Sequence, residues 1–117
     1  MSKLENLELY TERDNLVRSM HTALKECAIR GTHLSKAEHD YKVALAKFVL
    51  TERAKGTPAT LIKDIALGDE EVAGLRLKRD IAKSAYDTAK DAVNVYKLNV
   101  RLVENQIERE WGLAKDE

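Results

Sequence analysis

The sequence predicts an all-α protein, a helical hairpin or three-helix bundle extended by one very long C-terminal coiled-coil helix. Ala, Leu, Lys, Glu and Arg dominate the composition, and these residues are good helix formers. The 117 residues include five Gly and one Pro, far fewer than a loop-rich or all-β protein contains. Apolar residues recur three or four positions apart over most of the chain, which is the spacing of an amphipathic helix.

Glycine and proline divide this helical pattern into segments within a single expected domain, residues 1–117. Gly31 is expected to end the first helix in the left-handed conformation that suits a helix stop. Gly56-Thr57-Pro58 and Gly68 mark the next two breaks. The expected helices cover residues 3–30, 33–55, 58–67 and 69–114.

The fourth segment, residues 69–114, shows the clearest helical pattern in the sequence. Asp69 can cap its start, and the acidic Glu70 and Glu71 suit the positive end of the helix dipole. A three-four alternation of mainly apolar residues follows over five heptads, which predicts a coiled-coil seam. The seam consists of Val72, Leu75, Arg79, Ala82, Tyr86, Ala89, Val93, Tyr96, Val100, Val103 and Ile107.

Arg79 is the one charged member of the seam. Its guanidinium could pair with an acid across an interface and fix the register of the helices. Alternatively its aliphatic stem packs on the seam while the charge reaches water. The sequence leaves both interpretations open.

The length of the fourth segment predicts a partner. A helix of about 45 residues spans roughly 65–70 Å, whereas the second helix spans roughly 30 Å. The first helix could cover part of the remaining surface; otherwise the exposed seam needs a second chain. We expect a homo-oligomer, with a dimer favoured, and Trp111 as a further contact because tryptophan is enriched at interfaces. The expected interface residues are Leu4, Leu7, Arg79, Val100, Val103, Ile107 and Trp111.

Four basic residues, Arg76, Lys83, Lys90 and Lys97, repeat every seven positions on one flank of the same segment. They could follow the phosphates of a nucleic acid. The competing interpretation is a solvated coiled-coil flank, because acidic residues such as Asp87 lie three or four positions away. The net charge of zero, from 20 basic and 20 acidic residues, does not favour a protein that coats DNA.

No pattern in the sequence predicts catalysis, and we expect no catalytic residue, metal or cofactor. Phosphate-binding glycine loops, G-x-S-x-G and dinucleotide fingerprints are missing from the sequence. His21, His33, His39 and the single cysteine, Cys27, lack the paired spacing of zinc ligands. With no apolar N-terminal run and no apolar stretch of membrane-spanning length, we expect a cytoplasmic protein.

A block of the sequence resembles small helical proteins encoded in the early regions of tailed phages and prophages of Gram-positive bacteria. The similarity covers most of the chain and is clearest in its second half. It is carried by residues 56–72, by Leu75-Arg76 and Arg79-Asp80, by Lys97-Leu98, and by residues 104–111, Glu-Asn-Gln-Ile-Glu-Arg-Glu-Trp. The resemblance implies a setting in the bacterial host cytoplasm among replication and recombination genes. It implies no functional residues.

These observations together predict a non-enzymatic protein that acts by protein–protein interaction. The expected role is that of an accessory or inhibitor of a DNA-processing or host-defence machine. The alternative is a DNA-binding or single-stranded-DNA-binding accessory of phage replication or recombination that uses the basic residues of the long helix. The sequence does not specify the identity of the protein partner.

Overall fold

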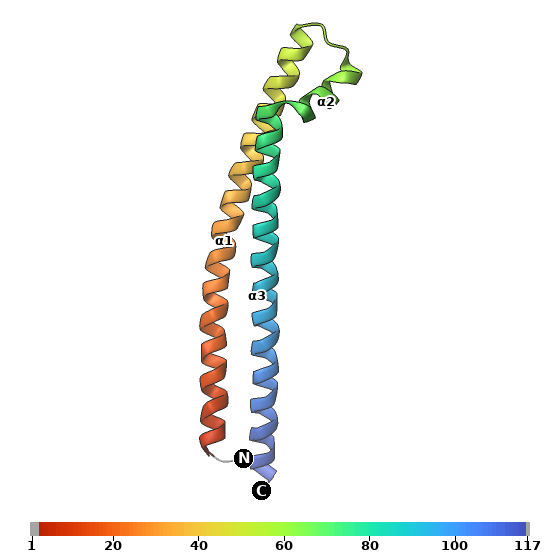
Figure 1. The fold of residues 1–117 in the computed structure, drawn as a ribbon. Coiled ribbons are helices and arrows are strands. Elements are labelled where there is room, and N and C mark those ends of the chain that lie inside the picture. Colours follow the sequence, from red (N-terminus) through yellow and green to blue (C-terminus); the bar gives the residue numbers. More distant parts are fainter. Residues whose placement is uncertain (1–2, 117) are drawn as a thin grey trace. The chain divides into compact units, whose positions relative to one another are not determined.

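The computed structural model describes the backbone of residues 3–116 and the side chains of residues 4–112. The described residues form three α-helices and no strand, which confirms the all-α prediction (Figure 1). The helices are α1 (Lys3–Ala54), α2 (Ala59–Gly68) and α3 (Glu70–Asp116). The contacts of the chain fall into two compact units, unit 1 (Met1–Ala28 with Thr88–Glu117) and unit 2 (Ile29–Asp87).

The first helix does not end at Gly31, so the expectation of two helices, 3–30 and 33–55, is wrong. Helix α1 continues through this residue, and Gly56 is the glycine with a positive φ, 82°. Nothing after Gly31 opposes a helix, whereas Pro58 lacks the N–H donor that a helix interior requires. Gly31 instead gives room to a neighbour: a Cβ there would lie 3.3 Å from Cε2 of Tyr86.

Helix α1 ends in a turn built around Gly56. The Gly56 N–H donates to the Arg53 carbonyl at 3.0 Å, and the Thr57 N–H donates to the Glu52 carbonyl at 3.1 Å. This pair of bonds is the Schellman arrangement, which needs a left-handed residue at the Gly56 position. The Thr57 hydroxyl also donates to Glu52 Oε2 at 2.8 Å and, as the largest cause, lowers the pKa of that carboxyl.

Helix α2 follows Pro58 and lies within a residue of the expected 58–67 segment. It buries Ile62 and Ala66, while Leu61 and Ile65 on the neighbouring face are exposed. Because burial of Ile62 and Ala66 removes apolar surface from water, this side of the helix anchors α2 in unit 2.

Helix α3 begins where the sequence predicts. The Val72 N–H donates to Asp69 Oδ2 at 3.1 Å, so Asp69 caps the helix, and Glu70 and Glu71 occupy its first turn. All eleven predicted seam positions, from Val72 to Ile107, are buried or half-buried. The periodicity of the sequence therefore identified the face of α3 that packs.

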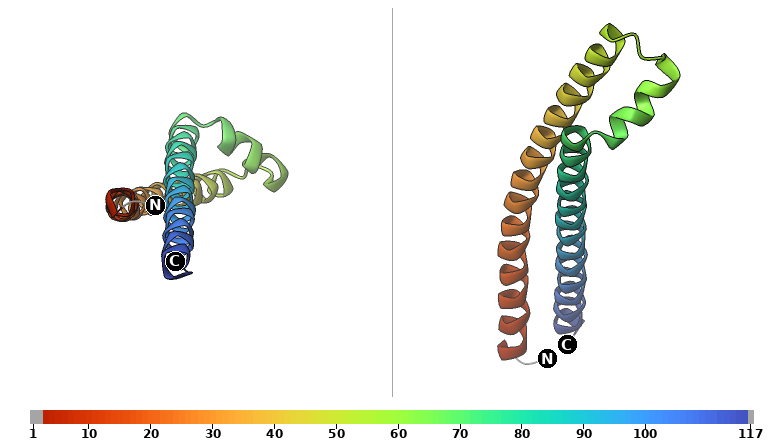
Figure 2. Two further views of the ribbon diagram at one scale, coloured as in Figure 1. Left: turned by 90° about the horizontal axis from the view of Figure 1, so that it is seen from below. Right: turned by 45° about the horizontal axis from the view of Figure 1, so that its top comes forward.

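In unit 1 the N-terminal half of α1 lies alongside the C-terminal half of α3 (Figures 1 and 2). Its buried side chains are Leu9, Val93 and Val103. In unit 2 the second half of α1 is assembled with α2 and the first half of α3, and the buried side chains there are Ile62, Ala66 and Val72.

The C-terminal seam is thus covered within one chain, which is the alternative that the sequence left open for the first helix. Val103 is only 7% exposed, and Val100 is half-buried. A second chain is therefore not required to cover these two valines, because the N-terminal half of α1 packs with this part of α3 within unit 1. That particular argument for an oligomer does not hold.

Candidate interaction site

An apolar groove lies in unit 1, where α1 begins and α3 ends. It is lined by Asn6, Leu7 and Tyr10 of α1 and by Ile107 and Trp111 of α3, and it encloses about 310 Å³. Leu7 and Trp111 are each 62% exposed, so two large apolar side chains meet solvent here. We call these five residues the end groove.

The helical spacing explains why these side chains meet. Leu7 and Tyr10 are three residues apart on α1, and Ile107 and Trp111 are four apart on α3, so each pair occupies one face of its helix. Leu4 is also exposed and lines a shallower hollow on α1 together with Leu7. The structure therefore brings together Leu7, Ile107 and Trp111, three of the predicted interface residues, and places Leu4 beside Leu7.

Acidic residues outnumber basic ones in the two helix segments that form the end groove. Residues 4–16 and 101–112 contain seven acidic and three basic residues, although the whole chain is neutral. Glu104 and Glu108 are exposed and share a helix face with Ile107 and Trp111, because their spacing is i, i+3, i+4, i+7. The groove therefore lies in a negative local field.

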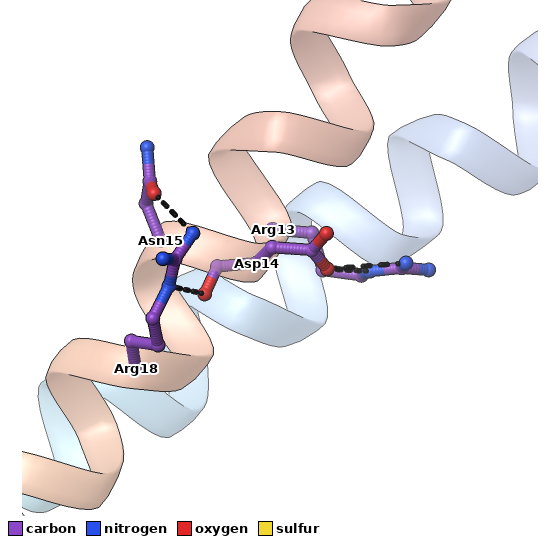
Figure 3. A network of polar contacts seen from close by, with 4 residues as sticks. All are labelled: Arg13, Asp14, Asn15 and Arg18. Carbon is purple, nitrogen blue, oxygen red and sulfur yellow. Dashed lines mark hydrogen bonds and ion pairs between the residues drawn. The ribbon is translucent and has the colours of Figure 1, made fainter.

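Figure 3 shows how one nearby arginine is engaged on α1. Arg13 Nη2 pairs with Asp14 Oδ1 at 3.3 Å, and Arg18 Nη2 donates to Asn15 Oδ1 at 3.0 Å. The Arg13 guanidinium carbon also lies 5.1 Å from the centroid of the Tyr10 ring. Because Asp14 offsets the charge of Arg13, this pair does not neutralise the other acids of the region.

Arg79 lies in unit 2 and not at the end groove. Its Nη2 pairs with Oδ1 of the adjacent Asp80 at 2.8 Å, and its guanidinium carbon lies 4.7 Å from the centroid of the Tyr41 ring. The hydrogen bond to Asp80 is the main reason that the pKa of Arg79 is raised. The side chain is half-buried on the seam and its charge is met by a neighbour on α3, which fits the interpretation of a packed stem.

The four basic residues Arg76, Lys83, Lys90 and Lys97 are all exposed on α3. Lys83 Nζ pairs with Asp87 Oδ2 at 3.0 Å, one helical turn away, as the solvated-flank interpretation expects. A phosphate at Lys83 would therefore compete with an existing carboxylate.

Sequence reasoning missed two members of the end groove, Asn6 and Tyr10. Tyr10 lines the groove together with Leu7, three residues earlier on α1. The spacing of Leu7 and Tyr10 could have indicated a shared face on the flank of the helix. Asn6 carries no comparable signal, because single asparagines are common on exposed helix surfaces.

The described part of the chain holds no cluster of three or more His, Cys, Asp or Glu side chains that could bind a metal ion. Cys27 is a free, half-buried thiol, and His21, His33 and His39 are exposed. Within residues 3–116, none of the three helices has the apolar length that crossing a bilayer requires.

Comparisons with known proteins add no relative to this picture. No protein-family model matches the chain. Neither the curated proteins nor the solved structures that were searched contain a match.

Proposed function

We propose that this chain is a non-enzymatic interaction protein that docks a helical segment of a protein partner in the end groove. The exposure of Trp111 beside Leu7 carries this proposal. A tryptophan and a leucine left in water at the mouth of a groove are typical of residues that a partner buries. We further infer that, within unit 1, the N-terminal half of α1 and the C-terminal half of α3 form an antiparallel coiled coil that holds the groove in place.

The setting of this function follows from the resemblance to early-region phage proteins. A small helical protein made during infection would assist a DNA-processing machine or block a host-defence machine in the bacterial cytoplasm. Both roles require binding to another protein and no chemistry of the chain's own. The homodimer expected from the sequence stays a proposal, and exposed apolar side chains of α3 outside the end groove, such as Val95, Leu98 and Leu102, could support it.

Affinity capture with matched variants tests the docking proposal. The groove variant combines Leu7→Asn with Trp111→Ala, and the control combines Leu77→Asn with Ile81→Asn, whose side chains are each 61% exposed on α3. We expect one protein to be retained by the wild type and the control and lost by the groove variant. Sedimentation of the three proteins shows whether that protein is a second copy of the chain. Equal retention by all three, or no retained protein, would contradict the proposal.

The DNA-binding alternative rests on a different observation, the exposure of the four basic side chains on α3. If they contact phosphates, affinity for DNA falls steeply with salt, and neutralising Lys90 and Lys97 together reduces the slope by roughly 2. Gel shifts at graded salt measure both quantities. Lack of a shift at low salt would remove this alternative.

A further inference from the structure

We infer that the partner of the end groove is a cationic amphipathic helix, with apolar residues on one face and Lys or Arg on the flanks. This inference rests on the proposed docking function and adds the chemistry of the occupant. It is carried by the shape of the groove, by the charges around it and by the aromatic rings within it.

The apolar lining fits one face of a helix. Side chains from two packed helices form the groove, so its floor is a short continuation of the α1–α3 seam next to the buried Leu9 and Val103. A third helix that offers apolar residues at i, i+3 or i+4 and i+7 would fill such a surface in the helix-in-groove manner. Leu7 and Trp111 would then lose their contact with water.

The acidic residues near the groove favour a partner helix whose flanks are positively charged. The exposed Glu104 and Glu108 share a face of α3 with Ile107 and Trp111, which line the groove, whereas Glu8 and Glu12 of α1 line the neighbouring hollow that it shares with Leu7. Lys and Arg on an incoming helix would meet opposite charge along the α3 side of the groove, which favours fast association and correct orientation. The same acids repel a nucleic acid and an anionic membrane surface.

The acidic surroundings also argue against a second copy of the chain as occupant. Two end grooves brought face to face would bring Glu104 and Glu108 of one copy close to the same residues of the other, in segments that hold seven acidic and three basic residues. Like charges facing one another across an interface disfavour association. A heterologous basic segment avoids this repulsion.

The aromatic rings add affinity for a cation. Arg13 already lies over the Tyr10 ring at 5.1 Å, so the chain's own guanidinium occupies that face. Trp111 presents a second, exposed aromatic face, and indole is the best ring for cation–π contact. An arginine or lysine of the partner can therefore use both the carboxylates and the indole.

A fluorescence titration tests this inference, because Trp111 is the single tryptophan of the chain and lines the groove. The probe is a tryptophan-free designed peptide of about 18 residues, long enough for roughly five helical turns. It carries Leu at i, i+3, i+4 and i+7 and Lys elsewhere. The comparison peptide carries Glu in place of every Lys.

We expect the Lys peptide to shift the Trp111 emission to shorter wavelength in a saturable manner, and the Glu peptide to leave it unchanged. Leu7→Asn should weaken binding about tenfold, as truncation of an interface anchor does. Glu104→Gln with Glu108→Gln should weaken it and flatten its salt dependence. Leu77→Asn is the control and should bind as the wild type does.

Several results would overturn the inference. Equal binding of both peptides, weakened equally by Leu7→Asn, would refute the cationic partner but leave the docking groove standing. If the Lys peptide binds equally well after Leu7→Asn and after the two Glu→Gln changes, its attraction to the protein is unspecific and the inference is refuted. A comparable emission shift with zwitterionic lipid vesicles would make a membrane surface the occupant. If neither peptide binds, the chemistry is refuted, and the capture experiment decides separately whether the groove docks a protein.

Discussion

Substitution of Gly31 by alanine tests whether this glycine serves packing and not a turn. Glycine in a helix interior costs about 0.5–1 kcal/mol relative to alanine, so Gly→Ala should stabilise α1 where space allows. At Gly31 the new Cβ would lie 3.3 Å from Cε2, 3.7 Å from Cδ2 and 4.0 Å from Cζ of Tyr86. The first of these distances is tighter than ordinary van der Waals contact, so the ring must shift by a few tenths of an ångström.

The size of the effect follows from two opposing terms. Overpacking a well-filled site costs about 1–3 kcal/mol, which exceeds the gain of about 0.5–1 kcal/mol from helix propensity. We therefore expect Gly31→Ala to lower the free energy of unfolding by about 1 kcal/mol. Gly74→Ala is the matched control, because a Cβ there meets nothing within 4 Å on α3. The control should raise the free energy of unfolding by about 0.5–1 kcal/mol.

Urea unfolding followed by far-ultraviolet circular dichroism measures both changes. A double-mutant cycle assigns the cost to the ring: in a Tyr86→Ala background, Gly31→Ala should recover the stabilising sign of Gly74→Ala. If Gly31→Ala stabilises the wild-type protein as much as Gly74→Ala does, the ring moves freely and the packing argument is refuted.

Three further predictions concern single side chains, each measured by urea unfolding or NMR titration. Asp69→Ala should cost about 1 kcal/mol by removing the cap of α3, and Asp69→Ser should restore most of it; no loss would contradict the capping bond. The lowered pKa of Glu52 contributes stability that is present above its ordinary value of 4.5 and is lost as pH falls through the folded-state value. Thr57→Val should therefore raise the pKa of Glu52 and reduce the loss of folding stability at acidic pH. An unchanged Glu52 titration would argue against the hydroxyl bond. Arg79→Leu should raise stability by about 1 kcal/mol, since an apolar residue suits a seam position; a loss instead would show that the cation over Tyr41 matters more.

The sequence predicted the parts of the fold that depend on hydrophobic periodicity and on local capping. The seam from Val72 to Ile107 packs as its spacing predicts, because burial of one helix face needs no knowledge of the partner. Asp69 could be identified as a cap because its role involves residues within one turn. Both features are encoded within a few neighbouring residues.

Gly31 could not be interpreted in the same way. Glycine is used both where φ is positive and where another group approaches closely, and the second use depends on a residue far along the chain. Tyr86 is that residue, and nothing near Gly31 in the sequence points to it. The cover of Val103 does not depend on Gly31, because the segment of α1 in the same unit ends at Ala28.

The sequence analysis named three of the five residues that line the end groove as interface residues but did not predict the groove itself, and this has a physical cause. Leu7, Ile107 and Trp111 stood out because large apolar residues near the ends of amphipathic segments lack obvious cover within the sequence. The meeting of α1 and α3 around them is set by the register of the hairpin, which helical periodicity on one helix does not fix. The position of Tyr10 in the groove therefore depends on how α1 and α3 pack against each other in unit 1.

Although the net charge of the chain is zero, its acidic and basic residues are concentrated in different places. Protein docking in the end groove and DNA binding by α3 can therefore be tested independently. Acidic residues are in excess in the two segments that form the end groove, while Lys90 and Lys97 lie on an earlier part of α3 and are not among its lining residues. Neutralising Glu104 and Glu108 therefore removes the attraction for a basic helix without touching the lysines that a phosphate would need. Loss of the glutamates should weaken binding of a basic helix, whereas loss of the lysines should weaken binding of DNA. The same set of variants therefore distinguishes a protein partner from a nucleic acid.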